Sequence, residues 1–119
     1  MNKKYKVICL CGSTRFKDDF IREQQRLTLA GNIVLSVGVF GHGDNIHLTS
    51  GEKAMLDDIH LHKIDMSDEI FVINRNGYIG ESTEKEINYA VIANKPIRYM
   101  EENCEKNRRN LSRIVQRFN

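Results

Sequence analysis

Three short runs of consecutive apolar residues predict strands that are buried on both faces. They cover residues 7–10, 33–37 and 70–73, and each run is followed by a segment rich in glycine, serine or asparagine. Strands of a covered parallel sheet show this pattern because neither of their faces meets solvent. A fourth strand is expected over 97–100, directly after Pro96.

The segments between these runs carry apolar residues at helical spacing. Phe16, Phe20 and Leu27 share one face of a helix expected over about 17–30, and Gly31 provides a stop signal. The same periodicity predicts further helices over about 50–67, 83–94 and 111–118.

The alternation of strands and helices predicts an α/β fold with one open parallel sheet and helices on both faces, of the Rossmann-like or flavodoxin-like kind. A chain of 119 residues is too short for two cores, so residues 1–119 are expected to form a single domain. Ligands of such sheets bind beyond the carboxyl ends of the strands. The loops at 11–15, 38–48 and 74–82 are therefore expected to form the site.

Composition narrows the class of protein but names no ligand. Hydrophobic residues make up 40% and charged residues 29%, which favours a globular protein over a disordered chain. The net charge of +2 is too small to predict a nucleic-acid or membrane-surface partner. No apolar stretch is long enough to span a bilayer and no signal peptide is recognisable, so we expect a cytoplasmic protein.

Cofactor and metal motifs are missing from the sequence. Neither G-x-G-x-x-G after the first strand nor G-x-x-x-x-G-K-[ST] occurs. His60 and His62 lie on opposite sides of a predicted helix, and the three cysteines, Cys9, Cys11 and Cys104, have no zinc-type spacing. We therefore expect no cofactor and no metal, and we interpret Cys9 and Cys11 as small buried hydrophobes.

The turn Gly12-Ser13-Thr14-Arg15 joins a buried strand to a helix, where free backbone N–H groups favour an anion. Gly12 permits close approach, Ser13 and Thr14 offer hydroxyl groups, and Arg15 offers a guanidinium suited to phosphate or carboxylate. The alternative is structural: a glycine turn, a serine or threonine helix cap and a solvated arginine.

A second candidate anion or sugar site, Gly80 to Thr83, is predicted at the same edge of the sheet. Glu86 lies one turn further along the helix, where the helix dipole is expected to lower its pKa and keep it ionised for work as a nucleophile or base. Alternatively, Thr83 and Glu86 have the spacing of a capping box. The two roles are compatible.

Three segments together resemble the nucleoside 2-deoxyribosyltransferase superfamily. They are 11–15 (Cys-Gly-Ser-Thr-Arg), 67–70 (Ser-Asp-Glu-Ile) and 80–90, which contains Glu86, and the resemblance extends from about residue 6 to residue 100. It is nearest to the 2′-deoxynucleoside 5′-phosphate N-hydrolase branch. The resemblance implies cleavage or transfer at the N-glycosidic bond of a nucleotide or deoxynucleotide, with Glu86 as the nucleophile. It also implies a nucleoside or nucleotide as the small-molecule partner and a homodimer or larger homo-oligomer.

The resemblance also implies a role for other residues. His42 would lie in the loop that contacts the nucleotide, and the 5′-phosphate would be held by Gly12, Ser13, Arg15, Gly80 and Ser82.

Two positions depart from the family pattern. Cys9 stands where the family often has tyrosine, and His60 stands where it has an acid/base aspartate, although a histidine can transfer protons near neutral pH. A non-catalytic nucleotide-binding module is therefore an alternative. A phosphoribohydrolase of the lysine-decarboxylase-like group is another, because 80–86 also resembles the motif G-x-G-T-x-x-E of that group.

Overall fold

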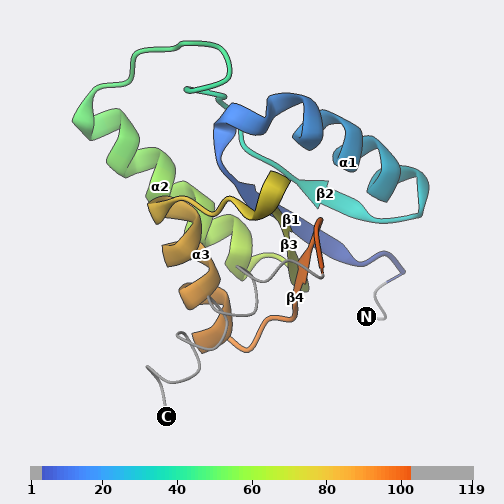
Figure 1. Ribbon diagram of the computed structural model, residues 1–119. Helices are drawn as coiled ribbons and strands as arrows, with labels where there is room; N and C mark the ends of the chain where they lie inside the picture. The colour runs from blue at the N-terminus through green and yellow to red at the C-terminus, as the bar shows by residue number, and fades with distance from the viewer. Residues whose placement is uncertain (1–3, 103–119) are drawn as a thin grey trace.

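The computed structural model of the protein describes residues 4–102, which contain one sheet of four parallel strands. In the order in which they lie across the sheet, the strands are β2 (Ile33–Leu35), β1 (Val7–Gly12), β3 (Glu69–Ile73) and β4 (Ile97–Tyr99). Figure 1 shows β1 and β3 at the centre of the fold. The predicted open parallel sheet is confirmed.

Three helices cover the two faces of this sheet: α1 (Lys17–Leu29), α2 (Ser50–Asp65) and α3 (Glu81–Ile92). Helix α1 lies on one face, whereas α2 and α3 lie on the other, as their separate hydrophobic clusters show (Figure 1). Two short 3₁₀ helices, η1 (Thr14–Phe16) and η2 (Arg75–Gly77), follow β1 and β3. Helices on both faces were predicted, and the structure confirms them.

The side chains of β1 alternate between the two faces of the sheet, with aliphatic residues on one face and cysteines on the other. Ile8 and Leu10 pack with Phe20 of α1 in an apolar cluster. Cys9 and Cys11 point to the other face, where α2 and α3 pack, and both are fully buried. Successive side chains of a strand alternate between faces, so the two cysteines necessarily share the α2–α3 side.

The central strands end together at the edge where ligands bind in open parallel sheets. Gly12 pairs with Ile73, and these are the last residues of β1 and β3. A Cβ atom at Gly12 would lie 2.7 Å from the Ile73 carbonyl oxygen, so only glycine permits this approach. From β1 the chain goes outward to β2 at one edge of the sheet, whereas from β3 it goes outward to β4 at the opposite edge. The topological switch point therefore lies at the carboxyl ends of β1 and β3.

Strand β2 is shorter than the run at 33–37 predicts. It pairs with β1 only from Ile33 to Leu35, and after that the Lys63 Nζ of α2 donates a 2.7 Å hydrogen bond to the carbonyl of Ser36. The chain therefore leaves the sheet at Ser36, and Val37 becomes part of the cavity wall described below.

Helix α3 begins earlier than expected, and the capping box predicted for it is absent. Gly80 is its N-cap, and the Gly80 carbonyl accepts the N–H of Glu84 at 2.9 Å. Thr83 therefore lies inside the first turn, where it is buried and cannot cap with Glu86. The observed capping box belongs to α2 instead, between Thr49 and Glu52, and it was not predicted from the sequence.

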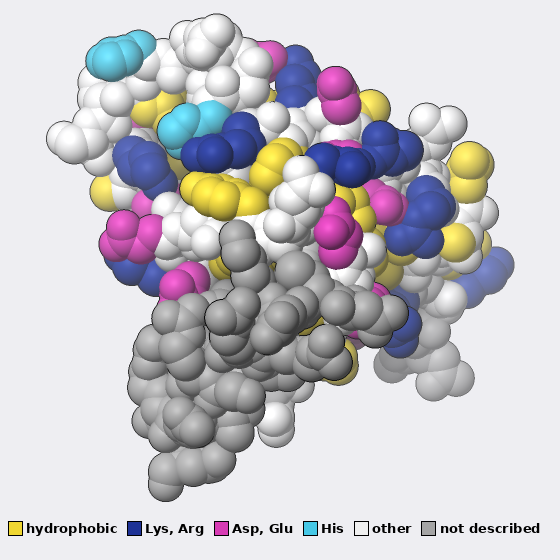
Figure 2. Space-filling view, viewed as in Figure 1, with side chains coloured by type: hydrophobic (Ala, Val, Ile, Leu, Met, Phe, Trp, Pro, Cys, Tyr) yellow, Lys and Arg dark blue, Asp and Glu magenta, His cyan; other side chains and the backbone are white. Residues whose placement is uncertain are grey.

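The helix predicted over 111–118 lies outside the described residues. Within residues 4–102, none of the helices combines the length and apolar content needed to cross a bilayer. On the part of the face that Figure 2 shows in colour, Lys and Arg side chains are interspersed with Asp and Glu side chains.

Candidate functional site

A cavity of about 460 Å³ opens at the carboxyl edge of the sheet. Its walls come from the turn after β1, the loop after β2, one side of α2 and the start of α3, and it has the size of pockets that hold small organic ligands. The eight residues that the resemblance places in the site all line it: Gly12, Ser13, Arg15, His42, His60, Gly80, Ser82 and Glu86. The fold thus brings together residues that lie up to 74 positions apart.

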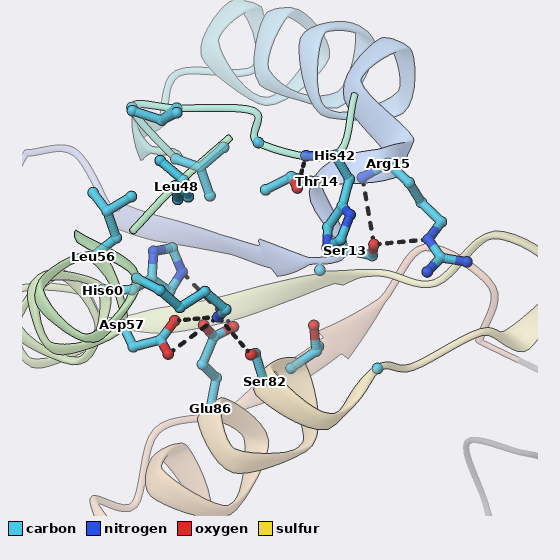
Figure 3. A pocket seen from close by; sticks show the side chains of 18 of the residues that line it. Ser13, Thr14, Arg15, His42, Leu48, Leu56, Asp57, His60, Ser82 and Glu86 are labelled. Carbon is cyan, nitrogen blue, oxygen red and sulfur yellow. Dashed lines mark hydrogen bonds and ion pairs between the residues drawn. The ribbon is translucent and has the colours of Figure 1, made fainter. Parts of the chain in front are cut away.

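The turn after β1 holds its polar groups in place at the mouth of the cavity (Figure 3). The Ser13 Oγ accepts hydrogen bonds from the backbone N–H of Arg15 at 3.3 Å and from Arg15 Nε at 3.1 Å. The Arg15 guanidinium also lies 4.3 Å from the centre of the Tyr78 ring, within cation–π distance. Ser13 is therefore a cap, as the structural alternative proposed, and it also orients Arg15 along the cavity.

The loop after β2 is tied to the same turn. The backbone N–H of His42 donates to Thr14 Oγ1 at 3.1 Å, and Figure 3 shows His42 on the same side of the cavity as Ser13 and Arg15. This contact explains how an irregular, glycine-rich loop comes to form one wall of the cavity.

Four side chains meet at the inner end of the cavity, and we call them the floor cluster: Cys9 and Cys11 from β1, His60 from α2 and Glu86 from α3. His60 Nε2 lies 3.5 Å from the sulfur of each cysteine and 4.0 Å from Glu86 Oε1. The side chains of His60 and Glu86 are only 6% and 13% exposed. Both line the cavity and point toward each other in Figure 3.

Burial, rather than the helix dipole, sets the acidity of Glu86. Removal from water raises its pKa from 4.5 to about 7, although the nearby His60 opposes the shift. The expectation that the dipole lowers this pKa is therefore wrong, because the dipole acts most strongly in the first turn of a helix and Glu86 lies beyond it. Near neutral pH the carboxyl group is shared between its ionised and protonated forms.

The other members of the floor cluster perturb one another. Burial lowers the pKa of His60, but the hydrogen bond with Cys9 and the charge of Glu86 outweigh it, so the pKa is raised. The pKa of Cys9 is lowered by its hydrogen bonds with Cys11 and with His60, whereas the pKa of Cys11 is raised by its bond to Cys9 and by burial. His60 is therefore the group that stabilises a thiolate at Cys9, and this contact is not visible in the sequence pattern.

Lys53 completes the polar lining on the α2 side, and it was not among the residues predicted from the sequence. Its Nζ donates to both carboxylate oxygens of Asp57, at 3.0 and 3.1 Å, and to the Ser82 Oγ at 3.1 Å. Lys53 thereby links α2 to the first turn of α3. Positions 53, 57 and 60 have the spacing i, i+4, i+7 of one helix face, and this signal would have placed Lys53 beside His60.

The floor cluster also contains the one group of three metal-type ligand atoms among the described residues. The two cysteine sulfurs and a ring nitrogen of His60 lie within 4.8 Å of one another. Residues 9, 11 and 60 match no metal motif in the sequence, because the histidine reaches the cysteines only through the fold.

The cavity therefore combines a cationic and hydroxyl-bearing mouth with a buried carboxylate and imidazole at its floor. Comparisons with protein-family models, with curated proteins and with solved structures gave no match for this chain.

Proposed function

We propose that this protein cleaves the N-glycosidic bond of a nucleotide or deoxynucleotide, or transfers its sugar, with Glu86 as the nucleophile. The observation that carries the proposal is the placement of one buried carboxylate beside a histidine, at the floor of a cavity whose mouth holds Ser13 and Arg15. A nucleotide fits this arrangement, because its 5′-phosphate and its reactive anomeric carbon lie at opposite ends of the sugar.

The mouth suits the anionic end of such a substrate. Arg15 supplies a guanidinium, Ser13 and Ser82 supply hydroxyl groups, and Lys53 supplies an ammonium group that is already bonded to Ser82. Gly12 and Gly80 leave their backbone accessible at the same place. Apolar side chains of the opposite wall offer a surface for the flat base: Leu48, Leu56 and Ile59.

In the proposed reaction, Glu86 acts as the nucleophile and His60 as the acid and base. Ionised Glu86 attacks the anomeric carbon, and the bond to the base breaks through a transition state of oxocarbenium character. Protonated His60 gives its proton to the departing base, whose nitrogen takes the bonding electron pair. Water or a second base then attacks the glycosyl intermediate and releases Glu86, with His60 taking the proton that water loses.

The raised pKa values of His60 and Glu86 are compatible with these two roles. His60 carries a proton more readily than a free histidine, and Glu86 retains an ionised fraction near neutral pH. An ionised Glu86 beside a protonated His60 is the state from which the attack begins.

The test is chromatographic detection of free base after incubation with each common nucleoside and 5′-monophosphate, in ribo and deoxy form. Glu86→Gln is expected to lower base release more than about 10³-fold, because the amide cannot form the intermediate. Asp58→Asn is the matched control, since the Asp58 side chain is 72% exposed on α2 and outside the cavity lining. Equal loss in both variants contradicts the assignment. Release from ribonucleotides alone supports the phosphoribohydrolase alternative.

A non-catalytic nucleotide-binding role is the second candidate. Its supporting observation is that the imidazole of His60, at the position where the resemblance implies an acid/base aspartate, is engaged by the sulfurs of Cys9 and Cys11, each 3.5 Å from its Nε2. A binder gives no base release from any substrate, with or without an acceptor base, but its thermal midpoint rises with a nucleotide, and Arg15→Ala abolishes that rise.

A further inference from the structure

The floor cluster has a second chemical capacity that needs no nucleotide. We propose that it binds a thiophilic divalent cation such as Zn²⁺, held by the two cysteine sulfurs, the His60 Nε2 and the Glu86 carboxylate. This site goes beyond the proposed function, and either can exist without the other.

The spacing of the donor atoms carries the proposal. A tetrahedral Zn²⁺ with Zn–S bonds of about 2.3 Å and Zn–N bonds of about 2.05 Å separates a sulfur from a nitrogen ligand by about 3.6 Å. His60 Nε2 already lies 3.5 Å from the sulfur of Cys9 and 3.5 Å from that of Cys11. All three donor atoms lie within 4.8 Å of one another, so side-chain rotations alone can bring them to the ligand spacing of one ion.

Glu86 supplies the fourth corner. Its Oε1 lies 4.0 Å from His60 Nε2, and a small side-chain rotation brings it to the ligand spacing of about 3.4 Å expected for oxygen and nitrogen on a tetrahedral zinc ion. It approaches from α3, opposite the strand that carries the cysteines.

The donor types select the class of cation. Two thiolates and an imidazole favour Zn²⁺ and other soft or borderline ions, whereas Mg²⁺ and Ca²⁺ prefer all-oxygen sites. Both cysteines are fully buried among apolar side chains such as Ile64 and Val72, where a thiolate requires a nearby positive charge. A bound cation supplies that charge and displaces the proton of each thiol that is still protonated.

The cavity leads from the solvent to two of the four donor groups. His60 and Glu86 line it, whereas Cys9 and Cys11 are fully buried and each contacts His60 Nε2 at 3.5 Å. A cation entering the cavity therefore meets the imidazole and the carboxylate first, and movement of the His60 side chain then gives it access to the sulfurs.

The direct test is titration of the untagged, reduced full chain with Co²⁺, followed by displacement with Zn²⁺. Cys104→Ser serves as the background, so that any thiolate signal comes from the two cysteines of β1. We expect intense tetrahedral d–d absorption and a thiolate-to-cobalt charge-transfer band that saturate together at one equivalent and disappear when Zn²⁺ is added.

Variants assign the ligands. The double variant Cys9→Ser, Cys11→Ser is expected to abolish the charge-transfer band. His60→Gln is expected to lower the affinity for Co²⁺ by at least about tenfold. His62→Gln is the matched control, because the His62 side chain lies on the same helix but is 71% exposed. It should bind Co²⁺ as the background protein does.

The proposal is overturned if the folded background protein shows no thiolate-to-cobalt band, or if the double cysteine variant binds Co²⁺ with unchanged affinity and spectrum. The first criterion holds even if the double variant does not fold. Metal binding is measured without nucleotide, and base release is measured with a chelator, so the two proposals fail separately. If both hold, one equivalent of Zn²⁺ suppresses base release, because the metal occupies Glu86.

Discussion

Two buried carboxylates on opposite sides of the sheet have opposite surroundings. Asp19, on α1, is 6% exposed and accepts hydrogen bonds from Arg75 and Arg22, which together lower its pKa. Glu86, on α3, faces His60 and two cysteines, and burial raises its pKa to about 7. A carboxylate held by two guanidinium groups is committed to structure, whereas the acidity of Glu86 is suited to chemistry.

The same contrast extends to the two faces of β1. The face toward α1 carries Ile8 and Leu10 against Phe20, which is ordinary apolar packing. The face toward α2 and α3 carries two cysteines beneath a histidine and a glutamate. Both faces carry a buried apolar cluster, but only the face toward α2 and α3 also carries titratable groups of the floor cluster.

The sharpest way to break this comparison is to remove each carboxylate and measure base release. Glu86→Gln is expected to reduce the rate more than about 10³-fold, whereas Asp19→Asn should retain the rate once folding is verified by circular dichroism. If Asp19→Asn loses as much activity as Glu86→Gln, the division of roles between the two sides is wrong.

Packing on the α1 side should produce the largest loss of stability. Phe20 is fully buried, so Phe20→Ala is expected to lower the free energy of unfolding by about 3–5 kcal/mol, measured by urea denaturation. Ile21→Ala is the control, because Ile21 is 50% exposed and should change stability by less than about 1 kcal/mol. Similar losses in the two variants would contradict the assignment of Phe20 to the core.

The ion pairs of Asp19 should contribute stability that depends on pH. Asp19→Asn is expected to cost about 1–3 kcal/mol near neutral pH, a loss limited by the exposure of Arg22 and Arg75, whose side chains are 55% and 45% exposed. Because the folded-state pKa of Asp19 lies below its ordinary value of 3.8, this contribution is present above pH 3.8 and is lost as the pH falls through the folded-state pKa.

Urea unfolding of both proteins across a pH series checks the sign of that effect. The difference between the native protein and Asp19→Asn should shrink on acidification. A difference that stays constant down to pH values well below 3.8 would show that the ion pairs do not set the pKa of Asp19.

The smallest expected effect concerns the helix that presents His60. Thr49→Ala removes the capping box of α2 and should cost about 1 kcal/mol, measured by thermal or urea unfolding. Ser50→Ala, one residue further and exposed, should change stability by less than about 0.5 kcal/mol. An equal effect of both changes would place the stabilisation elsewhere in the turn.

Local patterns were sufficient for the framework and for the approximate location of the site. The apolar runs at 7–10 and 70–73 correspond to β1 and β3, and the helix expected at 17–30 is observed as Lys17–Leu29. The edge of the sheet where loops converge also followed from this alternation, since parallel strands all end on the same side. The resemblance-based assignments of phosphate and sugar contacts stay predictions.

One boundary prediction and one ionisation prediction failed. Thr83 and Glu86 have capping-box spacing, yet α3 begins at Glu81 and places both inside the helix. The position of Glu86 near a helix start suggested a lowered pKa, but packing against β1 and α2 removes it from water and raises the pKa instead. The start of α3 is local, since Gly80 caps it, but the pKa of Glu86 cannot be obtained from neighbours within a few residues along the chain.

Local periodicity and strand polarity are enough to predict the order of strands and helices, the parallel sheet and the edge at which polar residues collect. The contacts of His60 with both cysteines of β1 and with Glu86 arise only when the chain folds. Those contacts join three elements far apart in the sequence. Burial and mutual contact of these titratable groups shift the pKa values of Glu86 and His60 from their ordinary values, an effect that no neighbour along the chain produces.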